Sequence, residues 1–284
     1  MALIAVESER RGEVGWIKIK PVQDTIEASV GEKDYTEVHI AIALALEEFR
    51  NDSTTRVIVI TGQRDGEFHV APRPAHYDVK AHCDRLNPIG RVDKLPTKPN
   101  RGVSRTIEAL ALCEIPVIAR LNGDAIGFGQ SIMFGCDIIV AREDAVISDV
   151  HLGQGDVVDH NGERRGFPWA VTPGDGALTF LPFFMTPAIM KEYLFLSRSF
   201  TAAQFAAMNI INYAVPLPAL DAKVDEILGE LLKRPAFALA RTKRACNKHI
   251  VAQMNLVTEQ AHESEMRDFV DHARLGGMDR LTPR

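Results

Sequence analysis

The stretch of residues 115–137, IPVIARLNGDAIGFGQSIMFGCD, decides the fold class of this chain. Its apolar, β-branched start at residues 116–121 predicts a buried strand, and Asn122-Gly123 turns the chain. Residues 127–134 are apolar and carry two glycines at their start, which predicts a buried helix. A strand, a glycine-rich turn and the start of a helix therefore follow one another directly.

A helix that begins at such a turn can stabilise an anion. Its first N–H groups have no partner within the helix and lie at the positive end of the helix dipole. Gly127 and Gly129 let the backbone come close to a ligand because they carry no side chain. The backbone N–H of Phe128 or Gly129 can then stabilise a developing enolate or tetrahedral oxyanion. A plain tight turn is the alternative interpretation.

The whole chain has the composition of an ordinary globular protein. Its 284 residues are 46% hydrophobic and 25% charged, which suits one large domain or a core with a smaller helical part. The formal net charge of −5 argues against nucleic acid as a partner. We expect neither a signal peptide nor a membrane span, because no apolar run is long enough. The cysteines show no metal-type spacing and predict reduced thiols in a cytoplasmic protein: Cys83, Cys113, Cys136 and Cys246.

Strand patterns dominate the first part of the chain. We predict strands at residues 14–20, 56–61, 137–141 and 145–148, and helices at residues 38–49 and 104–113. Prolines divide residues 71–101, which predicts an extended surface excursion, either a mobile loop or a lid. A second irregular, glycine-rich stretch occupies residues 153–176.

Helical patterns dominate the remainder. Thr186-Pro187 places a capping hydroxyl before a proline, and Thr201-Ala-Ala-Gln204 fits a capping box. Residues 221–232 and 237–267 also have helical patterns. We therefore divide the chain into a strand-rich core, residues 1–200, and a helical region, residues 201–284.

The run that opens at Ile115 resembles the signature of the crotonase (enoyl-CoA hydratase/isomerase) superfamily. Members of that family carry N-G-x-A-x-G-G-G and then C-D-x-x-x-A, and this chain has NGDAIGFG and then CDIIVA. Other segments resemble the family in the same order: residues 56–62 (RVIVITG), 68–71 (FHVA) and 201–216 (TAAQFAAMNIINYAVP). The resemblance covers most of the chain.

This resemblance implies an α/β fold, a spiral of ββα units followed by a C-terminal helical region used for trimerisation. It implies an oxyanion hole of two backbone N–H groups, which by position belong to Val70 and Phe128. It also implies a small carbonyl or acyl-CoA substrate and a homotrimer or dimer of trimers, with no nucleic-acid or membrane partner.

The departures from the family pattern concern the acid and the base. Hydratases of the family carry two glutamates, and this chain has Ser131 and His151 in their places. A serine takes no proton at neutral pH without a base beside it, so a two-glutamate hydration mechanism is excluded. His151 titrates near neutrality and becomes the candidate base. Such a base needs a carboxylate to fix its tautomer, and Asp175 in PGDG offers one.

The pair His151 and Asp175 resembles the β-diketone hydrolase branch of the family, typified by 6-oxocamphor hydrolase. That branch has an active-site histidine where this chain has His39, and a C-terminal glutamate where it has Glu263. The histidine that the branch carries in the glycine turn is replaced here by Phe128. The resemblance implies catalytic roles for His151, Asp175, His39 and Glu263.

The implied mechanism is a retro-Claisen cleavage. His151, oriented by Asp175, activates water, which attacks one ketone of a 1,3-dicarbonyl. The N–H groups of Val70 and Phe128 hold the oxyanion or the leaving enolate, which the imidazolium then protonates. The reaction requires no metal and no cofactor, and a coenzyme A thioester stays open as the substrate.

Two alternatives to this reaction stay open. The chain could be an enoyl-CoA hydratase or isomerase in which His151 or Asp175 replaces the glutamates. It could also be a non-catalytic relative that keeps the fold for assembly or ligand binding. The triplet Ala71-Pro72-Arg73 replaces the G-A-D of the family and counts against the usual coenzyme A adenine site.

Two groups of side chains could bind an anionic substrate. One lies in an insertion, residues 156–171, and consists of Arg164, Arg165 and Trp169. The other lies on a late helix, where it could contact coenzyme A phosphates, and consists of Lys243, Arg244 and Lys248. A solvated loop and a solvated helix face are the alternatives for these groups.

Overall fold

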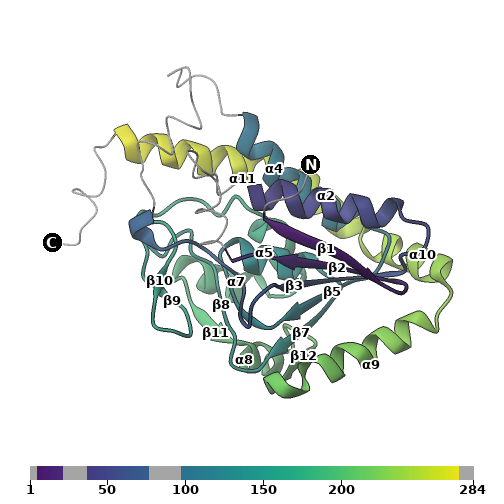
Figure 1. Ribbon diagram of the computed structural model, residues 1–284. Coiled ribbons are helices and arrows are strands. Elements are labelled where there is room, and N and C mark those ends of the chain that lie inside the picture. The colour runs from purple at the N-terminus through teal and green to yellow at the C-terminus, as the bar shows by residue number, and fades with distance from the viewer. Residues whose placement is uncertain (1–4, 22–36, 77–96, 275–284) are drawn as a thin grey trace.

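The computed structural model describes residues 5–21, 37–76 and 97–274 (Figure 1). The N-terminal elements are β1 (Val6–Arg11), β2 (Val14–Ile19), α2 (Glu37–Asn51), β3 (Val57–Gly62), β4 (Gly66–Val70), η1 (Pro74–His76) and α4 (Thr97–Leu112). The central elements are β5 (Val117–Leu121), β6 (Gly123–Ile126), α5 (Phe128–Gly135), β7 (Ile138–Arg142), β8 (Val146–Ser148), β9 (Val157–Val158) and β10 (Arg164–Arg165).

The C-terminal part is mainly helical. Its elements are α6 (Ala177–Phe180), η2 (Leu181–Phe183), α7 (Pro187–Phe195), β11 (Ser199–Thr201), α8 (Ala202–Ala207), β12 (Tyr213–Val215), η3 (Leu217–Ala219), α9 (Leu220–Leu232), α10 (Ala236–Cys246) and α11 (Lys248–Arg274). Among the described helices, none combines the length and apolarity that crossing a bilayer requires.

From β3 to β8, consecutive strands alternate between two sheets, and β9 and β10 form a separate two-stranded sheet. The larger sheet has the order β1-β2-β3-β5-β7-β12, in which all neighbours are parallel except β1 and β2. The smaller sheet has the order β11-β8-β6-β4, in which β4, β6 and β8 are parallel and β11 is antiparallel. Each of the pairs β3–β4, β5–β6 and β7–β8 gives one strand to each sheet, and α4 and α5 follow the first two pairs. This is the spiral of ββα units expected from the sequence.

The larger sheet is buried on both faces. Successive side chains of β3 point to opposite faces. Ile58 and Ile60 join the main core, whereas Val57 and Val59 pack with Val224 of α9 on the other side. Each such fully buried side chain contributes roughly 1.5–3 kcal/mol of transfer free energy. On the far side of the main core, α2 and α11 pack against α4, as Figure 1 shows.

The structure corrects two predicted boundaries. Helix α4 begins at Thr97 rather than near residue 104, so Pro99 lies in its first turn. A proline fits there because the first N–H groups of a helix need no partner within it. Residues 123–126 were predicted as a turn but form β6, which pairs with β4. Residues 77–96, which hold Cys83 and most of the expected excursion, lie outside the described residues.

The predicted helix caps are confirmed. The side chain of Thr186 accepts from the N–H of Ile189, and Thr201 forms a capping box with Gln204. The long helical pattern at residues 237–267 is divided into α10 and α11, with Asn247 between them. Helix α11 packs against both α4 and α6, so it lies over the segment that carries Asp175.

Candidate active site

The site lies where three parallel strands of the smaller sheet end. β4 ends at Val70, β6 at Ile126 and β8 at Ser148, and the three strands are neighbours. Helix α5 begins directly after β6, and His151 follows directly after β8. The carboxyl ends of parallel strands meet at one edge of a sheet, where ligands commonly bind. Residues far apart in sequence therefore converge at this edge.

The two expected backbone donors both face this edge. The N–H of Ala71 donates to the carbonyl oxygen of Ile126 on β6 (3.0 Å). Successive N–H groups of a strand point to opposite sides, so the N–H of Val70 points away from β6, and β4 is an edge strand. Phe128 is the first residue of α5, so its N–H has no partner within the helix. Both groups therefore stay candidate donors to a substrate oxygen.

The glycines of the turn are required by the backbone. Gly127 has a φ of 69°, in the left-handed region that favours glycine. A Cβ on Gly129 would lie 2.0 Å from the carbonyl oxygen of His69 on β4. Only glycine allows α5 to approach β4, the strand that carries Val70, this closely.

The imidazole of His151 is held on its Nδ1 side by Asp149. Nδ1 lies 3.0 Å from Oδ1 and 3.1 Å from Oδ2 of Asp149, and both side chains are buried. The main-chain N–H of His151 also donates to Oδ1 of Asp149 (2.9 Å). We predicted from the sequence that Asp175 orients His151. That assignment is corrected, because Asp149 occupies the orienting position on Nδ1.

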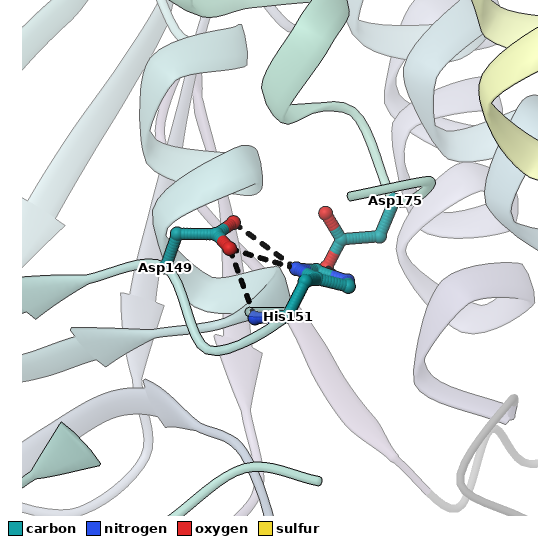
Figure 2. Close-up of side chains that lie close together, drawn as sticks. All are labelled: Asp149, His151 and Asp175. Atoms are coloured by element: carbon teal, nitrogen blue, oxygen red, sulfur yellow. Dashed lines mark hydrogen bonds and ion pairs between the residues drawn. The ribbon is translucent and has the colours of Figure 1, made fainter. Parts of the chain in front are cut away.

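Two further carboxyl groups face the other ring nitrogen. Nε2 of His151 lies 3.6 Å from Oδ2 of Asp175 and 3.6 Å from Oε1 of Glu265 on α11. Figure 2 shows the imidazole between Asp149 and Asp175. The other oxygen of Asp175 accepts from Ser131 Oγ (2.7 Å). His151 and Asp175 are thus brought together as expected, but through Nε2 rather than through Nδ1.

These carboxyl groups determine the charge of the imidazole. Burial favours neutral His151, but the negative charges of Asp149 and Asp175 outweigh burial and raise its pKa to about 10. Burial raises the pKa of Glu265 to about 8, and it also raises the pKa of Asp175. At neutral pH these shifts favour the imidazolium of His151 and the neutral acid of Glu265. These shifts favour His151 as a proton donor, whereas its position in the sequence predicted the base.

A cation could also be held here. Asp149, His151 and Asp175 offer ligand atoms that lie within 4.8 Å of one another. Nδ1 of His151 is already bound to Asp149, and one oxygen of Asp175 accepts from Ser131. A cation would therefore have to displace the proton from Nε2 before it could bind this nitrogen together with the remaining oxygen of Asp175.

His39 and Glu263 have different positions relative to the site. The ring of His39 on α2 lies 3.9 Å, centroid to centroid, from that of Phe128, so His39 lies beside the glycine turn. Glu263 pairs with Arg267 (3.3 Å), and its side chain is 43% exposed. The glutamate that α11 brings to His151 is Glu265. Glu263, the residue predicted from the sequence, faces away from His151, because a shift of two along a helix turns a side chain to a different face.

The cations singled out in the sequence mostly have structural partners. Arg165 pairs with buried Asp159 (2.7 Å), and Arg164 pairs with exposed Asp156 (2.9 Å). Trp169 is buried in a cluster with Val171, Met266 and Phe269. Buried Lys243 pairs with Asp137 (2.6 Å) and donates to the carbonyl of Ile115, whereas Arg244 and Lys248 are exposed. The insertion reaches the site, since the Phe167 ring lies 5.7 Å, centroid to centroid, from that of His151.

Sequence reasoning missed four buried polar residues around the site. They are Asp149, Glu265, His69 and His262. The ring of His69 lies 6.0 Å, centroid to centroid, from that of Phe128. The pKa of His262 is lowered by burial and by the charge of His151. The D-x-H spacing of Asp149 and His151 was the signal that could have identified the first. The others stand in runs that give no signal in a single sequence.

The sequence of this chain is similar to those of known proteins. A family model described as enoyl-CoA hydratase/isomerase matches residues 35–278. A short-chain-enoyl-CoA hydratase of Clostridium acetobutylicum is 26% identical over 269 residues, which are 93% of this chain and 88% of the relative.

Two solved structures share the fold. An enoyl-CoA hydratase of Bacillus halodurans has a TM-score of 0.73 at 17% identity, covering 93% of this chain and 95% of that one. A β-diketone hydrolase of the cyanobacterium Anabaena sp. PCC 7120, bound to (S)-3-oxocyclohexyl acetic acid, has a TM-score of 0.73 at 21% identity, covering 95% and 96%. The family match and the shared spiral lead to one conclusion: this chain belongs to the enoyl-CoA hydratase/isomerase family of the crotonase superfamily.

Proposed function

We propose that this protein is a carbon–carbon hydrolase that cleaves a 1,3-dicarbonyl compound, a β-diketone or a β-oxo acyl-CoA, by a retro-Claisen reaction. The observation that carries this proposal is the buried imidazole of His151 between Asp149 and Asp175. The two hydratase glutamate positions hold Ser131 and His151 instead. The fold shared with a β-diketone hydrolase is consistent with the same choice.

The proposed reaction begins with a water molecule beside Asp175. The carboxylate takes a proton from this water, and the hydroxide attacks one carbonyl carbon, whose oxyanion is held by the N–H groups of Val70 and Phe128. The bond between the two carbonyl-bearing fragments breaks, and its electron pair forms an enolate on the leaving fragment. The imidazolium of His151 protonates the enolate carbon. Asp175 then returns its proton to His151, and the site is restored.

A mechanism in which Asp175 is the base and His151 is the acid suits the charges of the site better than one in which His151 is the base. Asp149 keeps His151 protonated at rest, so the imidazolium is available as the acid. Glu265 lies at the same distance from Nε2 as Asp175. Because the carboxyl group of Glu265 is neutral, it adds no second negative charge beside that nitrogen. Neither step requires a metal or a cofactor.

The test compares two substrates. Cyclohexane-1,3-dione is incubated with the protein, and ring opening to a keto acid is followed by NMR. Crotonyl-CoA is incubated in parallel, and hydration is followed by the loss of enoyl absorbance. Cleavage of the diketone supports the proposal, and turnover of crotonyl-CoA without diketone cleavage excludes it.

A second candidate is an enoyl-CoA hydratase or isomerase with unusual acid and base groups. The names of the curated relatives favour it, since they include a crotonyl-CoA hydratase and a short-chain-enoyl-CoA hydratase. In that case Asp175 and Glu265 would replace the two family glutamates. A third candidate is a non-catalytic relative, which would be supported if neither substrate is turned over and neither binds.

We also propose that the chain assembles as a homotrimer or a dimer of trimers. Large apolar side chains are exposed on α7, α10 and α11, namely Phe195, Phe237 and Leu256. Oligomerisation would remove these side chains from water. Light scattering at micromolar concentration should give the mass of three or six chains.

A cytoplasmic location is part of the same proposal. Among the described residues, Cys113, Cys136 and Cys246 are unpaired. Unpaired thiols are typical of proteins in a reducing compartment. Fractionation of cells that express the tagged protein would test the location directly.

A further inference from the structure

Five side chains at the site form a closed ring of polar contacts. Ser131 Oγ donates to Oδ1 of Asp175 (2.7 Å), and Oδ2 of Asp175 lies 3.6 Å from Nε2 of His151. On the other side of the imidazole, Nδ1 lies 3.0 Å from Oδ1 of Asp149, and Gln130 Nε2 donates to Oδ2 of Asp149 (3.3 Å). Gln130 Nε2 also donates to Ser131 Oγ (3.0 Å), which closes the ring. All five side chains are buried.

We propose that Ser131 and Gln130 are positioning residues that fix Asp175 and Asp149 on opposite sides of the imidazole and decide which carboxylate oxygen is left for water. The hydroxyl of Ser131 engages Oδ1 of Asp175, so Oδ2 is the oxygen that faces Nε2. A hydrogen bond to an ionised carboxylate also stabilises the ionised form. Ser131 therefore keeps Asp175 able to accept a proton, a consequence that rests on the proposed function.

The hydroxyl of Ser131 has a defined direction in this ring. It has one proton to donate, and Asp175 accepts that proton at 2.7 Å. Its lone pairs face Gln130 Nε2, which can only donate. Ser131 stands at the position where family hydratases carry a glutamate, so the same helix position here supports a carboxylate from another segment.

The amide of Gln130 is held in one orientation. Nε2 donates to both Ser131 and Asp149, whereas Oε1 is buried without a hydrogen-bond partner. Reversal of the amide would direct Oε1 at the carboxylate of Asp149, acceptor against acceptor. A buried acceptor without a partner destabilises a fold. Its presence here fits a side chain kept for its two donors rather than for stability.

The direct test is an NMR titration of the ligand-free protein labelled with ¹³C at the aspartate side-chain carboxyl, with Asp175 assigned by Asp175→Asn. In Ser131→Ala the titration midpoint of Asp175 should rise by about one pH unit, the effect of losing one hydrogen bond to a charged group. Ser131→Thr keeps the hydroxyl and should restore the midpoint. Gln130→Met should move it upward, and provides the test if Ser131→Ala does not fold.

Thr179→Val is the matched control for this titration. It removes a buried hydroxyl contact with Thr258 (2.8 Å) that lies outside the ring, so the midpoint of Asp175 should not change. A midpoint that stays at the wild-type value in both Ser131→Ala and Gln130→Met overturns the proposal. The titration uses no substrate, so it remains decisive even if the proposed function fails.

Kinetics with cyclohexane-1,3-dione provide the second readout. In Ser131→Ala, kcat at pH values below the Asp175 midpoint should fall by about tenfold, and the acid limb should move up by the same unit. KM should change little, because the lost contact is not with the substrate. Mass spectrometry of protein quenched in acid during turnover tests the rival role, since an acyl group on Ser131 would make it a nucleophile and overturn the positioning role.

Discussion

Asp149 binds His151 through both the main chain and the ring. Oδ1 of Asp149 accepts from the main-chain N–H of His151 (2.9 Å) and lies 3.0 Å from Nδ1 (Figure 2). The D-x-H segment after β8 thus fixes its own imidazole, and Nε2 is the nitrogen left to face Asp175 and Glu265. This relationship explains why an imidazole that is 2% exposed can keep a proton.

Asp149→Asn should lower kcat by roughly a hundredfold or more, because an amide neither fixes the tautomer nor supports the imidazolium. The pKa of His151 should fall towards its ordinary value, which ¹⁵N NMR of the imidazole would measure. Asp156→Asn is the control, since Asp156 is exposed and pairs only with Arg164 in the described structure. Equal activity of the two variants would contradict the role of Asp149.

Glu265→Gln and Glu263→Gln form a matched pair on α11. Glu265 lies 3.6 Å from Nε2 of His151, so its replacement should lower kcat by about tenfold or more, within the range of general acid–base effects. Glu263 pairs with Arg267 near the surface, so its replacement should change kcat less than about twofold. Steady-state kinetics of both variants on the same substrate measure this difference in kcat. A larger effect at Glu263 would restore the assignment made from the sequence.

Gly129→Ala should impair turnover more than it impairs substrate binding. Its Cβ would lie 2.0 Å from the carbonyl oxygen of His69, so α5 must move and carry the N–H of Phe128 with it. Loss of one oxyanion donor typically lowers kcat by about 10²–10³. Gly229→Ala in α9 is the control, because its Cβ meets open space. That variant should raise the free energy of unfolding by about 0.5–1 kcal/mol and keep full activity.

The free energy of unfolding should fall as the pH rises from about 6 to about 10. The folded-state pKa of His151, about 10, lies above its ordinary 6.5, so its contribution is complete below 6.5 and lost as the pH rises through 10. The raised pKa of Glu265, about 8 against 4.5, acts in the same direction. Urea unfolding at a series of pH values measures this dependence. His151→Gln should show a smaller decrease, and an unchanged decrease would contradict the assigned protonation.

Much of the fold could be predicted because it depends on local sequence patterns. The β-branched run of β3, the glycine turn before α5 and the capping box at Thr201 each depend on neighbouring residues. The strand β6 was missed because its GDAI segment is short and begins with a turn signal. Gly123 is required there by the sheet, since a Cβ would lie 1.8 Å from the main chain of Gly66.

The candidate site could be predicted only in part. His151 and Asp175 were found because a resemblance named their positions, and the structure brings them within 3.6 Å of each other. Which carboxylate binds which ring nitrogen depends on the direction of each side chain. The sequence does not report that direction for residues such as Asp149.

The sequence by itself determined the family, the spiral of paired strands and the glycine turn that presents the Phe128 N–H, because periodicity and backbone freedom are local properties. The tertiary structure decided the chemistry around His151. It placed Asp149 on Nδ1, brought Glu265 rather than Glu263 from α11, and joined Ser131 to Asp175. These relationships depend on how segments far apart in the chain pack together. Burial then makes each carboxyl group change the charge of its neighbours, because water is excluded and cannot screen them.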